Sequence, residues 1–123
     1  MLAVYLLGSR ADDGLRRLQN ECVEALGSDL DVGILFADRR GDPERLARLQ
    51  VALEDLFEPL RVDLVPLDRL DPIFQARAIS GHRIASSDPA ATDRRELEIL
   101  GRAGDLIPIQ RQIERDLFGA STT

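Results

Sequence analysis

The sequence contains no lysine and no tryptophan, and it has one cysteine, one histidine and one tyrosine among 123 residues. Because all 16 basic residues are arginine, three kinds of lysine chemistry are excluded: a Schiff base, a P-loop lysine and a catalytic lysine. A lone Cys22 excludes an intrachain disulfide and a cysteine cluster that would hold zinc. A lone His82, which we place in a loop, excludes a metal site built from several histidines.

Long apolar runs are also missing, since none approaches the roughly 20 residues that span a bilayer. The chain enters its first apolar stretch directly, without a basic leader, so we expect a cytoplasmic protein without membrane association. The net charge of −6 and a pI near 4.7 argue against direct nucleic-acid binding through bulk electrostatics. We expect one domain over residues 1–119, with a core at 2–85, C-terminal helices at 89–118 and a frayed tail at 120–123.

Apolar runs bounded by turn signals predict strands at 2–7, 30–36 and 61–65, with a small edge strand at 82–85. Helical spacing predicts helices at 15–26, from Asp42-Pro43 to the Pro59 stop, and at 73–79. The first of these helices carries Cys22 on its apolar stripe, where we expect it in the core. A last helix starts at Pro89 or Asp93 and runs towards 101–104, and we expect Pro108 to break or kink it before a final amphipathic segment.

This order of elements predicts the fold class. Three or four short strands that alternate with helices are typical of a small α/β (α+β) layer fold, with a short mixed sheet flanked by helices.

Two aspartates lie at the start of the second apolar run, at positions i and i+2. In a strand, Asp29 and Asp31 would point to the same face, about 6.5 Å apart, and could converge on a cation. Asp63 lies within the third strand and would complete a set of oxygen ligands of the kind that Mg²⁺ accepts. The alternative is that Asp29 caps a turn while the other two lie on solvated faces.

The first apolar run ends in a Gly-Ser turn. Gly8 would let backbone N–H groups approach a phosphate closely, and Ser9 would add a hydroxyl donor. The alternative is an ordinary turn. Arg10 fits a phosphate contact and a surface position equally well.

Together, the Gly-Ser-Arg turn, the Ser-Asp-x-Asp strand start and the Val-Asp-Leu-Val strand resemble the minimal nucleotidyltransferases of the DNA polymerase beta superfamily. The resemblance covers residues 2–85 and implies a polymerase-beta-like nucleotidyltransferase fold. It also implies that Gly8, Ser9 and Arg10 bind the nucleotide, with ATP as the substrate. Asp29, Asp31 and Asp63 would be the catalytic residues and the ligands of two Mg²⁺ ions, with Asp63 helping to activate the attacking hydroxyl.

The resemblance further implies transfer of NMP, as AMP, to a protein hydroxyl. Similar proteins act as antitoxins of a ribonuclease toxin of the higher-eukaryote-and-prokaryote nucleotide-binding (HEPN) type, so the expected partners are such a toxin and a nucleoside triphosphate, in a homo- or hetero-oligomer. This sequence has 19 residues between Ser9 and Asp29, where the family usually has about ten; we expect a longer helix to absorb them. The alternative function is a catalytically impaired binding module that neutralises its partner by complex formation.

Overall fold

The computed structural model describes residues 1–39 and 42–118; the predicted tail at 120–123 lies outside the described residues. The elements are β1 (Ala3–Leu7), α1 (Ala11–Leu18), β2 (Leu30–Leu35), α2 (Pro43–Phe57), β3 (Val62–Pro66), α3 (Pro72–Ile79), β4 (His82–Ser86) and α4 (Pro89–Phe118), with a 3-10 turn at Leu67–Arg69. No helix in the described ranges is both long enough and apolar enough to cross a membrane.

The four strands form one mixed sheet in the order β3-β2-β1-β4. β1 pairs antiparallel with β2 and with β4, whereas β2 and β3 run parallel. This arrangement confirms the predicted α+β class with a short mixed sheet, and it confirms the small edge strand. Pro66 is tolerated within β3 because that strand lies at the edge of the sheet, where a missing N–H donor leaves no ladder bond unmade.

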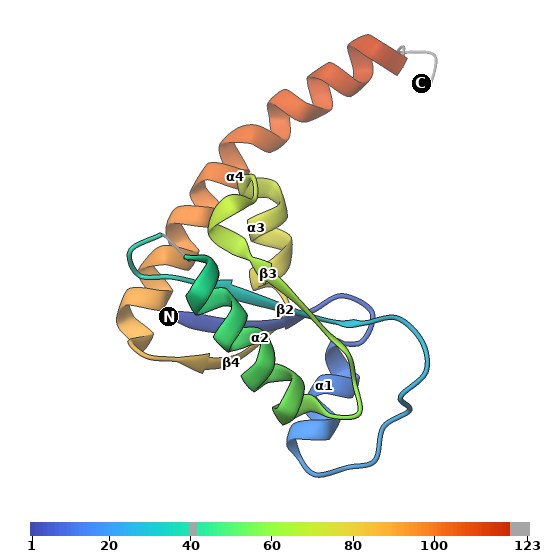
Figure 1. Ribbon diagram of the computed structural model, residues 1–123. Helices are drawn as coiled ribbons and strands as arrows, with labels where there is room; N and C mark the ends of the chain where they lie inside the picture. Colours follow the sequence, from blue (N-terminus) through green and yellow to red (C-terminus); the bar gives the residue numbers. More distant parts are fainter. Residues whose placement is uncertain (40–41, 119–123) are drawn as a thin grey trace.

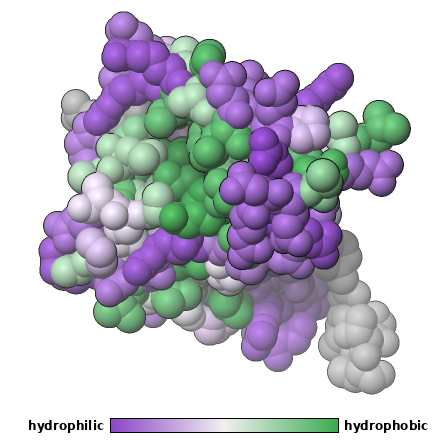
Figure 2. Space-filling model, turned by 90° about the horizontal axis from the view of Figure 1, so that it is seen from below, coloured by the Kyte–Doolittle hydropathy of each residue, from purple (hydrophilic) through white to green (hydrophobic). Residues whose placement is uncertain are grey.

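Helices cover both faces of the sheet (Figure 1). α1 and α2 pack over one face, where Leu53 and Phe57 join the buried strand residues. α3 and α4 pack over the other, where Tyr5 and Ile99 are buried. Seen from below, hydrophobic residues also gather at the centre of the surface, bordered by hydrophilic residues (Figure 2).

Three helices begin with the same dipeptide, an aspartate followed by a proline. The carboxylates of Asp42, Asp71 and Asp88 each accept a hydrogen bond from a backbone N–H in the first turn of the helix. Proline suits this position because its nitrogen would have no intrahelical acceptor there. The predictions at 42–43 and 71–72 are confirmed, and the start of the last helix is settled at Pro89.

Pro108 does not break α4, which continues through it as one helix of 30 residues; of the two expectations, a break or a kink, the break was wrong. A proline inside a helix removes one N–H and crowds the carbonyl four residues earlier, here that of Gly104. Gly104 is exposed, so water can take the place of the missing donor. The second half of α4 therefore extends beyond the rest of the domain (Figure 1).

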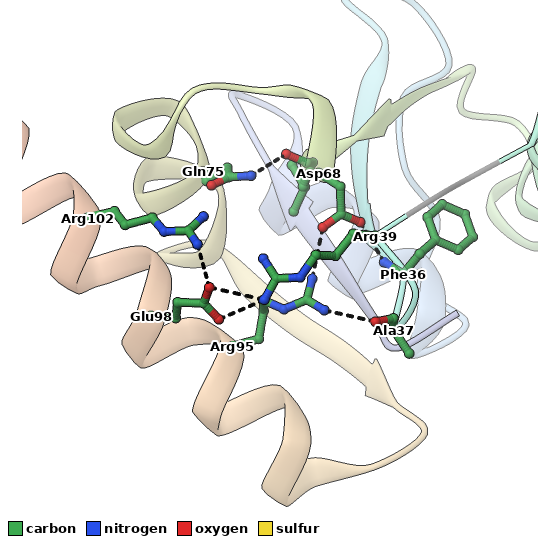
Figure 3. Close-up of polar contacts among 9 residues, drawn as sticks. Phe36, Ala37, Arg39, Asp68, Gln75, Arg95, Glu98 and Arg102 are labelled. Carbon is green, nitrogen blue, oxygen red and sulfur yellow. Dashed lines mark hydrogen bonds and ion pairs between the residues drawn. The ribbon is translucent and has the colours of Figure 1, made fainter.

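A buried ion pair fixes α4 against the ends of β2 and β3 (Figure 3). The Arg95 guanidinium lies 2.9 Å from the Asp68 carboxylate, and their side chains are 9% and 8% exposed. Asp68 also accepts a hydrogen bond from the backbone N–H of Phe36, and Arg95 donates to the carbonyl of Ala37. These bonds tie the chain after β2 to the turn after β3.

Replacing Asp68 should be strongly destabilising. Asp68→Ala leaves the Arg95 charge buried without its partner, so we expect the free energy of unfolding to fall by about 3–5 kcal/mol. Arg102→Ala is the control, since Arg102 pairs with Glu98 in an exposed position and should cost less than about 1 kcal/mol. Urea denaturation measures both, and equal losses would contradict this role of the ion pair.

Candidate functional site

The parallel pairing of β2 with β3 places two carboxylates side by side. Asp31 is directly opposite Asp63 in the register. The pKa of Asp31 is raised, first by burial, then by the charge of Asp63 and a hydrogen bond to it, and least by the charge of Asp29. The three acids predicted from the sequence therefore act on one another, and Asp63 is the closer partner of Asp31.

The Gly-Ser turn lies against this acid pair. Leu7, the last residue of β1, pairs with Asp31, and Gly8 comes next with φ +79°. A Cβ atom built on Gly8 would lie 2.5 Å from the Asp31 Oδ2 atom. Any side chain here would collide with the carboxylate, in addition to straining the backbone. The structure therefore brings the Gly-Ser turn next to the paired carboxylates of Asp31 and Asp63.

Ser9 reaches the start of β2 across the long intervening segment. Its Oγ atom lies 3.2 Å from the Oγ atom of Ser28, and both side chains are exposed. Ser28 immediately precedes Asp29, so the turn and the strand start each present a hydroxyl on the same side. Ser28 was not among the predicted site residues, although it lies within the Ser-Asp-x-Asp motif.

The segment between Ser9 and Asp29 is not the long helix that we predicted. α1 begins at Ala11 and ends at Leu18, and Asn20 has a left-handed backbone with φ 62°, which does not continue a helix. Residues 21–29 form neither helix nor strand. Cys22 is exposed here, so its predicted place in the core was wrong.

Arg10 holds this segment in place. Its buried guanidinium donates hydrogen bonds to the carbonyls of Glu24, Leu26 and Ser28, and to the Asp13 carboxylate. These bonds fold the segment back over the start of α1 and bring Ser28 to Ser9. Arg10 is therefore not a surface residue, which was one of the two places expected for it. The phosphate contact, the other, stays a prediction.

His82 is a second residue near the turn that the sequence left without a role. It lies on β4, not in a loop, and its Nε2 atom is 2.8 Å from the Asp12 Oδ1 atom in the first turn of α1. Since β4 pairs with β1, this contact helps to fix the helix after the Gly-Ser turn.

The acids suit a hard divalent cation by their chemistry. In the described part of the chain, no three His, Cys, Asp or Glu side chains are grouped as tightly as a formed metal site requires. Asp31 and Asp63 nevertheless meet, and the Asp63 carboxylate raises the cost of ionising Asp31. A divalent cation bound by their oxygens would remove that repulsion, and Mg²⁺ needs only one or two carboxylates besides water and phosphate. The residues present therefore fit the ion that the family resemblance implies.

No protein-family model and no curated protein matches this sequence. A chain in the crystal structure of the toxin-antitoxin MntA-HpeT, in a mutant form, is similar to it with a TM-score of 0.68 and 17% identity. The similarity covers 96% of this chain and 86% of that chain. Identity this low establishes the fold alone, which is the polymerase-beta-like nucleotidyltransferase fold expected from the motifs.

Removing the charge of Asp31 should stabilise the protein without divalent cations. Asp31→Asn removes repulsion from Asp63, so in EDTA at pH 7 we expect a gain of about 0.5–1 kcal/mol in the free energy of unfolding. A raised pKa in the folded state destabilises it only where the group is ionised. The gain should therefore shrink as the pH falls through the raised pKa of Asp31, and it should be lost below about 3.9, the ordinary pKa of aspartate. Asp55→Asn, at an exposed position of α2, is the control, and an Asp31→Asn protein less stable than wild type would contradict the repulsion.

Removing the Arg10 side-chain donors should loosen one segment. In Arg10→Met the carbonyls of residues 24, 26 and 28 lose their donor, so we expect amide hydrogen exchange across residues 20–28 to become at least about tenfold faster. Arg16→Met is the matched control, because Arg16 is exposed and its guanidinium lies 3.1 Å from the Asp13 carboxylate. Unchanged exchange at 20–28 in Arg10→Met would show that the segment does not depend on Arg10.

Proposed function

We propose that this chain is a Mg²⁺-dependent nucleotidyltransferase that transfers AMP from ATP to a hydroxyl of a protein partner, and that it acts as the antitoxin of a HEPN-type ribonuclease toxin. One observation carries the proposal: the backbone of Gly8 lies against the Asp31 carboxylate, which is itself paired with Asp63. A turn suited to phosphate and a pair of carboxylates suited to a cation thus adjoin, and nucleotidyl transfer requires that combination.

The turn supplies the phosphate-binding groups. Gly8 allows close approach of a triphosphate to the backbone, and the exposed hydroxyls of Ser9 and Ser28 can donate hydrogen bonds to its oxygens. α1 begins at Ala11, so the N–H groups of its first turn add a positive partial charge beside the same phosphates. Arg10 acts through the segment that it holds, by keeping Ser28 next to Ser9.

Asp29, Asp31 and Asp63 would hold the cation. When bound, Mg²⁺ neutralises charge on the triphosphate and lowers the barrier for displacement of pyrophosphate. Asp63 is exposed, so its carboxylate can accept the proton of an incoming hydroxyl. Asp31 is partly buried between Asp63 and the turn, which suits it to hold the cation against the phosphates.

The solved structure with the same fold supports the antitoxin part of the proposal. That structure is of a toxin-antitoxin, and its mutant form replaces two aspartates two positions apart with glutamate. Asp29 and Asp31 have the same spacing in this chain. The net charge of −6 also suits a basic, RNA-binding partner.

A second candidate function is a binding module without catalysis. It is favoured by the absence, among the described residues, of a formed cluster of three metal-binding side chains. Such a module would neutralise its partner by forming a complex, and its nucleotide site would have no role. The two functions differ in whether the chain binds ATP in a Mg²⁺-dependent manner.

Calorimetry with ATP, followed by transfer of labelled AMP to a candidate HEPN-type toxin, tests the proposal. We expect ATP binding with Mg²⁺ and not with EDTA, and a loss of transfer on the order of 100-fold or more in Asp29→Asn/Asp31→Asn, because the lost groups contact the reacting centre. The control is Asp55→Asn, an exchange of the same type at an exposed position of α2. Retained transfer in the first variant would rule out the metal assignment, and a stable complex without Mg²⁺-dependent ATP binding would favour the binding module.

A further inference from the structure

The second half of α4 carries four large apolar side chains that are exposed to solvent. They are 38%, 57%, 51% and 72% exposed and belong to Leu106, Ile109, Ile113 and Leu117. Their spacings of three, four and four residues place them on one side of the helix. We call these four residues the α4 stripe.

The stripe borders a groove between α4 and α3. The groove has a volume of about 500 Å³, and residues of both helices line it, including three of the four stripe residues. Phe74 of α3 adds an aromatic ring that is 55% exposed, with the Arg77 guanidinium 5.7 Å from the ring centre. Because this part of α4 extends beyond the sheet (Figure 1), the apolar surface is open to an elongated ligand such as a helix.

The charges next to the stripe are mainly negative. At 3.6 residues per turn, Asp105 and Asp116 flank it on one side and Glu114 flanks it on the other. Asp71 at the start of α3 also lines the groove. Arg115 falls on the opposite side of α4. Arg77 lines the groove itself, and Arg111 lines an adjoining pocket between α3 and α4, so two arginines stand against the four acidic residues at this border.

This acidic border determines which partner fits. Two copies of the chain joined through their stripes would bring acidic borders together, and like charges at an interface oppose association. A helix whose apolar face is bordered by arginine or lysine would bury its apolar side chains in the groove and meet opposite charge on both sides. A helix laid into an apolar groove is a common mode of recognition.

We infer that the α4 stripe and its groove bind an amphipathic helix with a basic border, supplied by a protein partner. The inference rests on the proposed function only in that the antitoxin needs a protein partner. The groove is lined by α3 and α4, whereas the nucleotide site is formed by β1, β2 and β3 with their loops. Partner binding and nucleotide binding are therefore separable by mutation.

Two synthetic peptides test the inference against the full chain. Each has about 20 residues with leucine and isoleucine on one helical face; one carries arginine along both borders of that face, and the other carries glutamate. By fluorescence anisotropy at low salt, we expect the arginine peptide to bind at least about ten times more tightly. Raising the salt concentration to about 0.5 M should largely remove the difference.

Variants on one helix locate the binding surface. Ile113→Glu should weaken binding of the arginine peptide at least tenfold, whereas Gln112→Glu introduces the same residue beside the stripe and should leave the affinity within about twofold. Circular dichroism checks that both variants are folded, and both should keep the Mg²⁺-dependent ATP binding of the wild type.

Three results would overturn the inference: equal affinity for the two peptides, an effect of Gln112→Glu equal to that of Ile113→Glu, or a dimer of the chain alone that Ile113→Glu dissociates. The last result would make a second copy the occupant. Failure of peptide binding with intact ATP binding leaves the proposed function standing. Intact peptide binding without ATP binding leaves this inference standing and removes the proposed function.

Discussion

The parallel pairing of β2 with β3 is the constraint on which the site depends. It is held at one end by the hydrogen bond from the N–H of Leu30 to the carbonyl of Arg61, and at the other by the bond from the N–H of Phe36 to Asp68. Between these bonds, Asp31 lies opposite Asp63. A shift of one residue would turn Asp63 to the other face of the sheet and separate the carboxylates.

This register has an energetic cost, since burial and the neighbouring carboxylates all disfavour the charged form of Asp31. Polar or apolar pairs at the same positions would stabilise the sheet better. Asp31 therefore departs from what packing favours, and it lies beside a turn whose positive φ at Gly8 favours glycine. Such departures are expected at a functional site. The buried ion pair of Asp68 and Arg95 fixes the C-terminal ends of β2 and β3. It thereby helps to hold the register in which Asp31 lies opposite Asp63.

Much of the fold was predictable because its signals are local. Apolar runs mark the strands, Asp-Pro pairs mark two helix starts, and the order of elements indicates a mixed sheet. The places of the candidate site residues on the fold were also predictable: Asp29 precedes β2 and Asp31 lies in it, Asp63 lies within β3, and Gly8 follows β1. Each of these positions follows from strand alternation and turn chemistry in the sequence.

The rest depended on contacts between distant residues. The apolar spacing over 15–26 indicated a helix, but the chain turns at Asn20, and residues 21–28 are held by hydrogen bonds from Arg10 to carbonyls 14, 16 and 18 residues away. No local pattern in the sequence reveals those acceptors. Pro108 does not end the helix, because the carbonyl of the exposed Gly104 can be hydrated within a continuous helix.

The central claim is that Asp31, Asp63 and Asp29 form a divalent-cation site beside the Gly-Ser turn. Anomalous diffraction from crystals soaked with Mn²⁺ and a non-hydrolysable ATP analogue tests it most directly. We expect an anomalous peak within about 2.5 Å of carboxylate oxygens of Asp31 and Asp63, with the triphosphate against Gly8 and Ser9. A peak only at other acidic residues, or no peak at saturating Mn²⁺, would contradict the claim.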